Sequence, residues 1–476
     1  MMKQSNVPYF IFVIGLFFCL ISFSFLTEGM FTDGIFYSCI SHQLATGQCS
    51  FWHLNDYTLN NFYSHPPLAL QMQGWFLSIF GDNIYCDKIY SVLTYIIVGL
   101  LMCLIWKKVT EKSDSTWMPL LFWVCTPLVT WGATNNMLEN TMSIFITASI
   151  YVCLCERRPY VSSFVAGLFV FLAFMVKGPT ALFPLVFPMI QYFFQKEKSL
   201  AHYLLRTIVM TASTVVCFGL MILISKDAQF FFINYYQQQI EESFNAPAVV
   251  AHRFQIVCKW IGEMLVGVAI IGAGFIITYK KQIFHKISNI KTSIRENNAL
   301  RKDLQTSLKF FLVGLCGVLP IMITMKQRSY YIIPTLPFFA ISMALIFKQI
   351  FKGNEIKETV KYSISCIVLL TAITLNVINF GKFSRDKETL HDIHAIEHII
   401  SHNDIILIPN SLSDEYSLHE YFSRYFDVKL STQENANKYM LFPKNENPND
   451  YQWFSKYQKV DISTKKYDFF ELKIEN

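Results

Sequence analysis

The chain has 476 residues, of which 53% are hydrophobic and only 16% are charged, and its formal net charge is +6. Soluble domains normally carry about 25% charged residues, so the composition excludes an ordinary soluble protein and indicates one that spans a membrane. The surplus positive charge is explained by topology, because cations gather in cytoplasmic loops, and it requires no nucleic-acid partner.

Uncharged apolar runs of membrane-spanning length recur along the chain. The first, residues 7–26, is about as long as a bilayer core is thick. No small-residue cleavage site follows it, so we predict a retained helix and not a signal peptide. Further runs lie at 89–106, 117–134, 141–155, 161–176, 179–194, 204–225, 257–278, 308–325, 331–348 and 362–380. The sequence therefore predicts about 11 spans.

The charged loops between these runs predict the orientation. Lysines and arginines gather at 107–112, 157–158, 196–206 and 280–309, which are alternate loops. By the positive-inside rule these loops are cytoplasmic. The N-terminus is then inside, and an odd number of spans places the C-terminus outside. We therefore predict a multi-pass protein of the cytoplasmic (inner) membrane whose C-terminal part is periplasmic or extracytoplasmic.

Three outward-facing segments are too long or too polar to be simple turns: residues 27–88, about 226–256 and 381–476. In the first, apolar residues recur at helical spacing between Ile35 and Leu44, which predicts an amphipathic helix lying along the membrane surface. Pro66 and Pro67 then open a second apolar stretch, and proline is well tolerated at a first helical turn. The segment therefore predicts two interfacial helices, and the second segment has the same surface-helix character.

The tail after the last span differs in kind. Residues 381–476 alternate helical patterns with short strand patterns, such as D-I-I-L-I-P at 404–409. We therefore expect an α-helical polytopic membrane protein in which residues 1–380 form a transmembrane catalytic module. Residues 381–476 are expected to form a small extracytoplasmic α/β domain.

Cysteine usage gives little functional information. Most of the 12 cysteines lie in apolar runs, where a free thiol behaves as a small hydrophobe. Cys39 and Cys49 fall in the first outer loop, where a disulfide is possible, although nothing in their spacing requires one.

Ionisable residues at the outer ends of spans are costly in a membrane and usually functional. The carboxylates are Glu28 and Asp33, after the first span, and Glu139, before the fourth; the basic residues are Lys177, His252, Arg253, Lys326 and Arg328. A carboxylate can take the proton from an attacking hydroxyl or amine, and cations can neutralise charge on a departing phosphate. This set is what a transferase acting on a lipid-linked phosphosugar requires.

Each of these residues also has a purely structural explanation. Asp33 could cap a surface helix, and Glu139 could be a polar residue at a span boundary that reaches water. Lys177 could extend to the lipid surface. Lys326 and Arg328 could contact lipid headgroups.

Four motifs in consistent order carry a resemblance to a known family. They are T-D-G-I-F-Y at 32–37 followed by P-P-L at 66–68, N-M-L-E-N at 136–140, F-M-V-K-G-P at 174–179 and R-S-Y-Y-I-I-P-T-L-P at 328–337. Over roughly residues 10–345 the chain resembles the GT-C glycosyltransferases. It is similar in particular to the branch that contains protein O-mannosyltransferases and bacterial lipid A aminoarabinose transferases.

The resemblance implies a multi-span enzyme that takes a sugar from a polyprenyl phosphate. The enzyme would transfer that sugar, with inversion, to a lipid, protein or glycan acceptor on the outer face of the membrane. By motif position Asp33 matches the family's first-loop carboxylate, which we take as the general base, and Glu139 matches the acidic residue of the second outer loop. The expected ligands of the donor phosphate are His65, Lys177, Arg253, Lys326 and Arg328. The aromatic residues expected to line the substrate cavity are Trp52, Tyr57, Tyr63 and Tyr330.

Two departures from the family's pattern bear on the cofactor and the donor. The family commonly shows Asp-Glu where this chain has Asp33-Gly34, and Lys before Pro-Pro, often with Glu before it, where this chain has Ser64-His65. The lysine is expected to contact the donor phosphate, and the glutamate to help bind a metal in the aminoarabinose branch. A divalent metal is thus one option whose expected ligands are not all present. His65 could meet the phosphate by a hydrogen bond, and with a charge if its pKa is raised.

A transporter or flippase of lipid-linked saccharides is the competing interpretation. It would need the same cations and a similar aromatic cavity. It would not need a carboxylate next to the first span, so the role of Asp33 separates the two interpretations.

Overall fold

A computed structural model describes residues 6–110, 115–194, 198–241, 249–279, 298–351, 356–434 and 437–473. The chain divides into two compact units, each described here by itself. The helical unit comprises Met1–Ser22, Tyr63–Ala69 and Ser91–Ile378, and the mixed unit comprises Phe23–Phe62, Leu70–Tyr90 and Asn379–Asn476. Most of the basic loop predicted at 280–309 lies outside the described residues.

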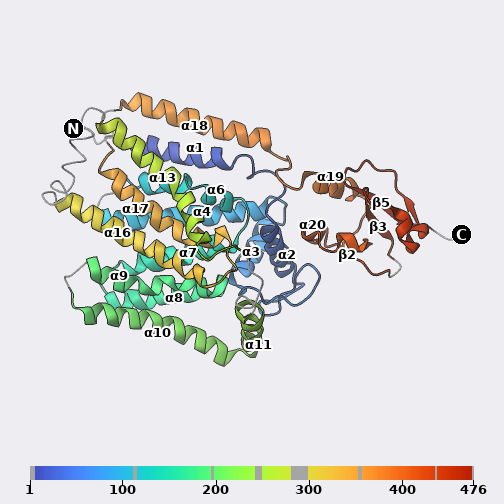
Figure 1. The fold of residues 1–476 in the computed structure, drawn as a ribbon, viewed down its shortest axis with the longest axis horizontal. Coiled ribbons are helices and arrows are strands. Elements are labelled where there is room, and N and C mark those ends of the chain that lie inside the picture. The colour runs from blue at the N-terminus through green and yellow to red at the C-terminus, as the bar shows by residue number, and fades with distance from the viewer. Residues whose placement is uncertain are drawn as a thin grey trace. The chain divides into compact units, whose positions relative to one another are not determined.

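The helical unit is a bundle of apolar helices, and every predicted span coincides with helical structure (Figure 1). Its elements are α1 (Val7–Ile21), α4 (Cys86–Thr110, begun in the mixed unit), α5 (Trp117–Val124), α6 (Pro127–Ala133), α7 (Leu138–Cys153), α8 (Pro159–Lys177), η1 (Gly178–Val186), α9 (Phe187–Phe194), α10 (Leu200–Ile224), α11 (Lys226–Tyr235), η2 (Tyr236–Glu241), α13 (Gln255–Tyr279), α16 (Asn298–Val318), η3 (Leu319–Ile323), η4 (Ser329–Thr335), α17 (Leu336–Lys348) and α18 (Glu358–Asn379). The chain is thus an α-helical polytopic membrane protein.

Seven helical stretches of the described chain are long and apolar enough to cross a membrane, and α1 and α7 are shorter apolar helices. The predicted spans 161–176 and 179–194 form one stretch, Pro159–Phe194, within which α8 gives way to η1 at Gly178. The predicted span 117–134 is interrupted before Pro127, where α6 begins. Proline supplies no backbone N–H for a continuous helix, which accounts for the interruption.

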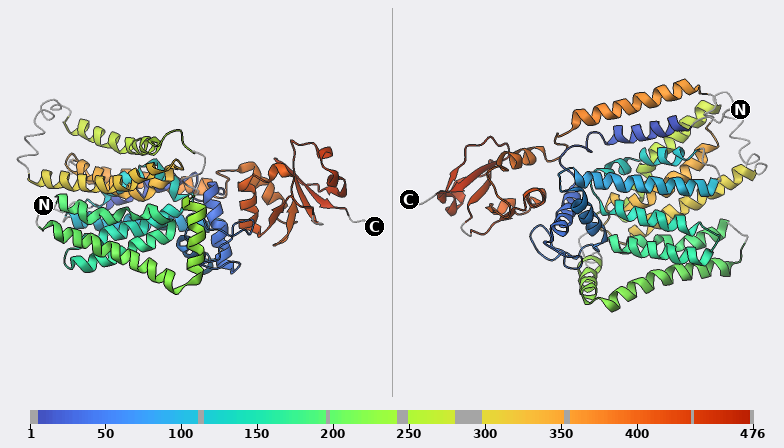
Figure 2. Two further views of the ribbon diagram at one scale, coloured as in Figure 1. Left: turned by 60° about the horizontal axis from the view of Figure 1, so that its bottom comes forward. Right: turned by 180° about the vertical axis from the view of Figure 1, so that it is seen from behind.

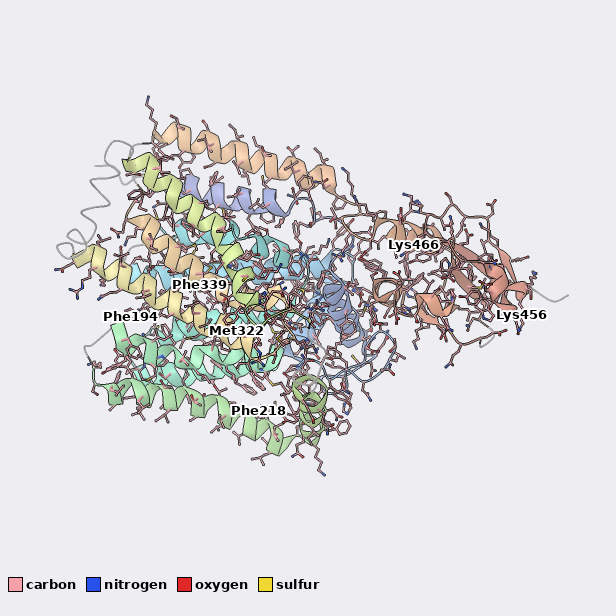
Figure 3. All side chains as sticks on the ribbon, in the orientation of Figure 1. Phe194, Phe218, Met322, Phe339, Lys456 and Lys466 are labelled. Atoms are coloured by element: carbon pink, nitrogen blue, oxygen red, sulfur yellow. The ribbon has the colours of Figure 1, made fainter. Side chains whose placement is uncertain are left out.

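Helices α10, α13 and α18 present large apolar side chains on their outer faces. Leu223, Ile277 and Val377 are 77%, 77% and 69% exposed. A soluble monomer rarely carries such continuous apolar surface, whereas a bilayer accommodates it. Between helices, aromatic rings fill the space: Phe339 of α17 lies against Trp260 and Phe311, with ring centroids 5.1 and 5.6 Å away (Figure 3).

The first and last helices of the bundle, α1 and α18, lie side by side, as seen from the front (Figure 1) and from behind (Figure 2, right). Ser365 Oγ of α18 donates to the carbonyl of Pro8 (2.6 Å), and Asn376 Nδ2 donates to the carbonyl of Phe18 (3.0 Å). A Cβ added at Gly15 would lie 2.9 Å from the backbone nitrogen of Leu369. A small residue at this contact lets the two backbones approach closely, as is common between membrane helices.

The mixed unit contains a five-stranded sheet in the order β2-β1-β3-β5-β4. Its elements are α2 (Thr32–Thr46), most of α3 (Leu68–Phe80), α19 (Lys387–Ile396), β1 (Ile405–Leu407), η6 (Asn410–Leu412), α20 (Tyr416–Phe426), β2 (Lys429–Ser431), β3 (Tyr439–Pro443), η7 (Pro448–Asp450), η8 (Gln452–Lys456), β4 (Tyr457–Lys459) and β5 (Tyr467–Leu472). Strand β1 pairs in parallel with β2 and β3, while β5 pairs antiparallel with β3 and β4. The predicted small α/β fold of the tail is confirmed.

The segment after the first span, predicted to be the first outer loop, packs with the tail, which the sequence did not predict. Met30 and Ile35 belong to the same buried core as Leu390, Leu418 and Phe469. Both predicted helices of this loop exist, and α3 begins directly after Pro67. The helix α2 is buried on most of its faces, so it lacks the exposed face expected of an amphipathic helix; its place at the membrane surface stays a prediction.

Polar groups on α2 are satisfied inside the mixed unit, which explains how this helix can be buried. His42 contacts Asp82 (2.5 Å) and Asp427 (2.9 Å), and Arg424 contacts Asp82 (2.6 Å) and Asp87 (3.1 Å). Burial alone would lower the pKa of His42, but its hydrogen bonds to Asp427 and Asp82 raise it to about 9. A charged network thus joins residues of the first outer loop to α20. Cys39 and Cys49 are both free thiols.

Candidate active site

A buried ion pair joins the start of α7 to the end of α8. Lys177 Nζ lies 2.5 Å from Glu139 Oε1, and the two side chains are 6% and 0% exposed. Glu139 lies in the first turn of α7 and Lys177 in the last turn of α8. Acidic groups are favoured at helix N-termini and basic groups at C-termini, so each helix end stabilises the charge it carries.

Aromatic rings cover the lysine of this pair. Lys177 Nζ lies 5.2 Å from the ring centroid of Tyr330 and 4.9 Å from that of Tyr331. Tyr330 in turn stacks on Trp131, with centroids 5.9 Å apart. Cations are attracted to aromatic faces, more strongly where water is excluded. The ammonium group of Lys177 is therefore held in place by one carboxylate and two rings.

A neutral hydrogen-bond network fixes the first turn of α7. Asn140 Oδ1 accepts from Tyr95 Oη (3.0 Å), while Asn140 Nδ2 donates to Ser91 Oγ and to the carbonyl of Gly132, both at 2.9 Å. Asn140 is 2% exposed, and buried polar groups of this kind stabilise a single geometry when they are satisfied. The network therefore positions Glu139, the preceding residue.

His65 lies close enough to Lys177 and Lys326 to be affected by both charges. Burial lowers the pKa of His65 well below its usual value, and the positive charges of Lys177 and Lys326 lower it further. The imidazole is therefore neutral at physiological pH. The sequence left open a positively charged His65 that would face a phosphate, and the lowered pKa does not support this. A neutral imidazole ring can still form a hydrogen bond to a phosphate.

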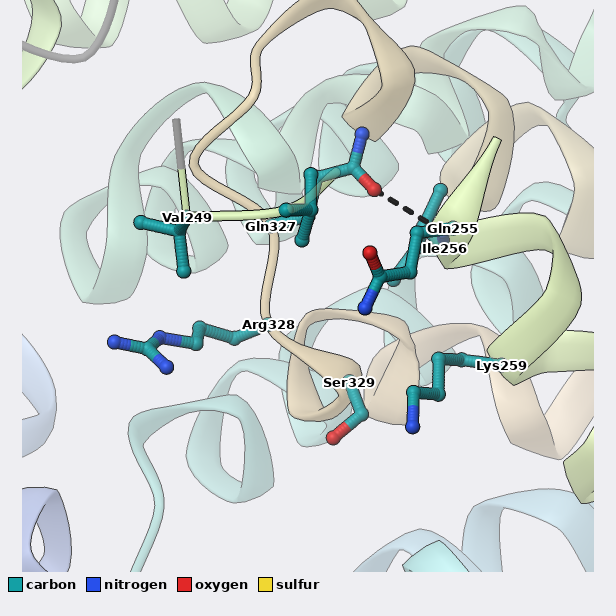
Figure 4. Close-up of a pocket in the computed structure, with 8 residues that line it drawn as sticks. Val249, Gln255, Ile256, Lys259, Gln327, Arg328 and Ser329 are labelled. Atoms are coloured by element: carbon teal, nitrogen blue, oxygen red, sulfur yellow. Dashed lines mark hydrogen bonds between the residues drawn. The ribbon is translucent and has the colours of Figure 1, made fainter. Parts of the chain in front are cut away.

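The structure contains a cavity of about 190 Å³, part of whose lining directly follows Lys326 in the sequence (Figure 4). Its lining residues are Val249, Val250, Gln255, Ile256, Lys259, Gln327, Arg328 and Ser329. Gln327 shapes one wall, since its Oε1 accepts from the backbone N–H of Ile256 (3.0 Å) and its Nε2 donates to the carbonyl of Arg253 (2.9 Å). Arg328 and Lys259 are both exposed, so two cations border a polar cavity.

The segment 326–331 contributes to the cavity and to the surroundings of His65 and Lys177. The charge of Lys326 lowers the pKa of His65, Arg328 lines the cavity, and the ring of Tyr330 lies beside Lys177. Of the remaining predicted residues of the helical unit, Tyr63 is buried against Phe231, with centroids 5.5 Å apart. Arg253 is exposed and meets the cavity wall through its carbonyl.

Three predicted site residues belong to the mixed unit. Asp33 lies half-buried in the first turn of α2. Tyr57 contacts the rings of Phe36 and His419, at 5.8 and 5.7 Å, and Trp52 is half-buried against Phe51. Asp33 is therefore presented by a well-packed helix, with Tyr57 in the same unit.

Sequence reasoning missed Lys259, Gln327 and Tyr331. Lys259 is a single cation near the start of an apolar span, which gives no functional signal of its own. Gln327 and Tyr331 lie in the segment 326–331, and only the fold shows which of its residues meet Lys177 and which meet the cavity. Within the described residues, no group of three or more His, Cys, Asp or Glu side chains could hold a metal ion.

Gly178 gives a direct test of how tightly this site is built. Its φ is +73°, and an added Cβ would lie 2.0 Å from Tyr235 Oη. We expect Gly178→Ala to lower stability by about 1–3 kcal/mol, because a left-handed backbone and a steric clash coincide. Thermal unfolding in detergent measures this. Gly219→Ala is the matched control, since nothing lies within 4 Å of its Cβ position; equal losses in both variants would contradict the proposed close packing.

Comparisons with known proteins establish the fold. No protein-family model and no curated protein matches the sequence. Among solved structures, ArnT from Cupriavidus metallidurans in the apo state matches with a TM-score of 0.64 and 12% identity over 97% of both chains. The same protein bound to undecaprenyl phosphate matches with a TM-score of 0.62 and 11% identity over 98% of both chains. The chain therefore has the GT-C fold seen in ArnT, over its whole length.

Proposed function

We propose that this protein is an integral-membrane glycosyltransferase that uses a lipid-linked sugar donor. The observation that carries the proposal is the cavity bordered by the cations Lys259 and Arg328, in a chain with the fold of ArnT. Cations that border one cavity suit a departing phosphate, because they can neutralise the charge that develops on it. The similarity to a structure that holds undecaprenyl phosphate supports a polyprenyl-phosphate sugar as donor.

In this mechanism Asp33 removes the proton from the acceptor hydroxyl or amine as it attacks the anomeric carbon, so the transfer inverts that carbon. The bond between the sugar and the phosphate breaks, and the phosphate leaves with its electron pair. Arg328, Lys326 and Lys259 stabilise the charge on the leaving phosphate. The neutral ring of His65 adds a hydrogen bond.

Lys177 has a more indirect role in this scheme. The charge of Lys177 is already offset by Glu139, 2.5 Å away. The ion pair therefore acts on the phosphate as a fixed dipole, and Lys177 does not act as a free positive charge. Glu139 holds the lysine and the surrounding loop in place. Arg253, which is exposed, contacts the phosphate or the lipid headgroups at the entrance.

The acceptor is a lipid, protein or glycan on the outer face of the membrane. In this proposal the N-terminus is cytoplasmic, residues 1–380 form the catalytic module, and residues 381–476 form an extracytoplasmic domain. The partners are therefore the lipid-linked donor, the acceptor and the membrane lipids.

Substitution of the cavity cations tests the donor site. We expect Arg328→Gln and Lys259→Gln each to raise the KM for a polyprenyl-phosphate sugar about tenfold or more, because a hydrogen bond to a charged group contributes about 1.5–3 kcal/mol. Release of polyprenyl phosphate from purified protein in nanodiscs measures this. Lys226→Gln, an exposed cation at the start of α11, is the control, and an unchanged KM in both cavity variants would contradict the proposed donor site.

A further inference from the structure

Helix α13 carries the cavity cation Lys259 (Figure 4), yet it packs only lightly on the rest of the bundle. Only 11% of its membrane-spanning window is buried, against 83% for the stretch Ser329–Lys348. Lipid is as apolar as the side chains that meet it, so close packing and hydrogen bonds, and no hydrophobic force, fix the orientation of such a helix. The position of Lys259 therefore depends on the specific contacts that α13 makes.

Gln327 and Glu263 contact the end of α13 that carries Lys259. Gln327 Oε1 accepts from the backbone N–H of Ile256 (3.0 Å). Glu263 Oε2 accepts from the backbone N–H of Leu128, at the start of α6, at 2.7 Å. Glu263 is half-buried and follows Lys259 by one helical turn, a spacing that places both side chains on the same side of the helix.

The N–H group of Leu128 needs an acceptor from outside its own helix. Pro127, which opens α6, has no N–H to donate, and Thr126 before it forms no side-chain cap. A backbone N–H without a partner is costly inside a membrane, and a carboxylate is favoured at a helix N-terminus. Ionisable residues within a span are rare and usually functional, so Glu263 indicates a role beyond packing.

Helix α6 is itself fixed at the candidate active site. The carbonyl of Gly132 accepts from Asn140 Nδ2 (2.9 Å), and the ring of Trp131 stacks on Tyr330, with centroids 5.9 Å apart. Both partners belong to the elements that form the site. The hydrogen bond from Leu128 therefore joins the lightly packed α13 to a firmly held part of the bundle.

We propose that Glu263 is a positioning residue for Lys259: it holds α13 on α6 and so keeps the ammonium group at the cavity, where the donor phosphate binds. Without this contact α13 is free to turn about its axis. Donor binding then weakens, whereas the chemical step at the acceptor is unaffected. This inference rests on the proposed function, and it deepens the description of the donor site.

Donor kinetics of the full-length protein in nanodiscs test the role. Glu263→Met removes the acceptor and should raise the KM for a polyprenyl-phosphate sugar by up to about tenfold, with an unchanged kcat, because Lys259 is misplaced. Glu263→Gln keeps an oxygen that accepts from the Leu128 N–H, so its KM should stay within about twofold of the wild type. Thr278→Val is the matched control. It removes a hydrogen bond to the carbonyl of Ile350 (3.2 Å) at the other end of α13, and it should leave the KM unchanged.

A double-variant cycle separates positioning from a general loss of structure. If Glu263 acts through Lys259, then Glu263→Met has no cation left to misplace in a Lys259→Gln background. The KM of the double variant should therefore equal that of Lys259→Gln alone. The thermal midpoint should fall equally in both backgrounds, because the Leu128 N–H loses its acceptor in each.

The outcomes separate this inference from the proposed function. An unchanged KM in Glu263→Met, an equal rise in Thr278→Val, or an equal further rise in the Lys259→Gln background would overturn the role of Glu263 while the wild type still transfers sugar. No transfer by the wild type from any polyprenyl-phosphate sugar would overturn the proposed function, and the role with it. If Glu263→Met does not fold, Glu263→Asp takes its place in the cycle, because the shorter side chain withdraws the carboxylate from Leu128.

Discussion

Replacement of Asp33 by Asn is expected to abolish sugar transfer and to leave the fold intact. Asn has the same shape as Asp but cannot accept the acceptor's proton, and general-base catalysis contributes about 10²–10⁴-fold to rate. Asp33 lies half-buried in the first turn of α2, so the neutral amide is readily accommodated. The measurement is release of polyprenyl phosphate coupled to product formation by the purified variant.

Asp414→Asn is the matched control for this variant. Asp414 is an exposed carboxylate of the same mixed unit, and its loss should change neither rate nor thermal midpoint. Equal membrane expression of both variants separates catalysis from folding. A fully active Asp33→Asn protein would contradict the general-base role and would favour the transporter interpretation.

Loss of one partner of the Glu139–Lys177 pair is expected to have the largest effect on stability. Lys177→Met leaves a carboxylate that is 0% exposed beside apolar groups and aromatic rings. Breaking a buried ion pair in this way costs about 3–5 kcal/mol, chiefly because the remaining charge is uncompensated. We therefore expect a lower thermal midpoint in Lys177→Met and in Glu139→Gln, with sugar transfer lost in parallel.

The double variant Glu139→Gln with Lys177→Met distinguishes a structural pair from two independent residues. It should recover much of the stability, because no buried charge remains, but it should not recover activity if the ordered loop is needed. The ion pair between Lys456 and Glu434 is the control, since both side chains are exposed and such pairs contribute about 0–1 kcal/mol. Similar losses for Lys456→Met and Lys177→Met would contradict this account.

The bundle was predictable because its signal is local. Apolar runs of sufficient length must become helices in a bilayer, where each backbone group needs an internal partner, and every predicted span coincides with helical structure. The start of α3 after Pro67 was also predictable, since proline favours the first helical turn. Local patterns did not predict the exact ends of every helix. The predicted span 117–134 is interrupted before Pro127, and the predicted spans on either side of Gly178 form one continuous stretch.

The long-range contacts were not predictable from local patterns. The sequence predicts a surface helix at α2, in part because Ser41, His42 and Gln43 are polar. All three side chains are buried, because residues from other segments form hydrogen bonds with them. The ends of α7 and α8 were each identified separately, but only the packing of the two helices shows that Glu139 and Lys177 form one pair.

Ser64-His65 remains the clearest departure from the GT-C pattern. A lysine at this place would carry a charge near the donor phosphate, whereas His65 is neutral beside Lys177 and Lys326. Under the proposed function, the positive charge near the phosphate is expected to come from Lys326 and the cavity cations Arg328 and Lys259. Donor affinity is accordingly expected to depend on the 326–331 segment.

The proposed function requires that the chain cleaves a lipid-linked sugar donor and does not merely move it. Purified protein in nanodiscs, given a polyprenyl-phosphate sugar labelled in both the sugar and the lipid and a mixture of lipid, peptide and glycan acceptors, tests this directly. The account predicts that the two labels separate, with polyprenyl phosphate released and the sugar on an acceptor. Reconstituted vesicles in which the intact donor crosses the membrane with both labels still joined would contradict it.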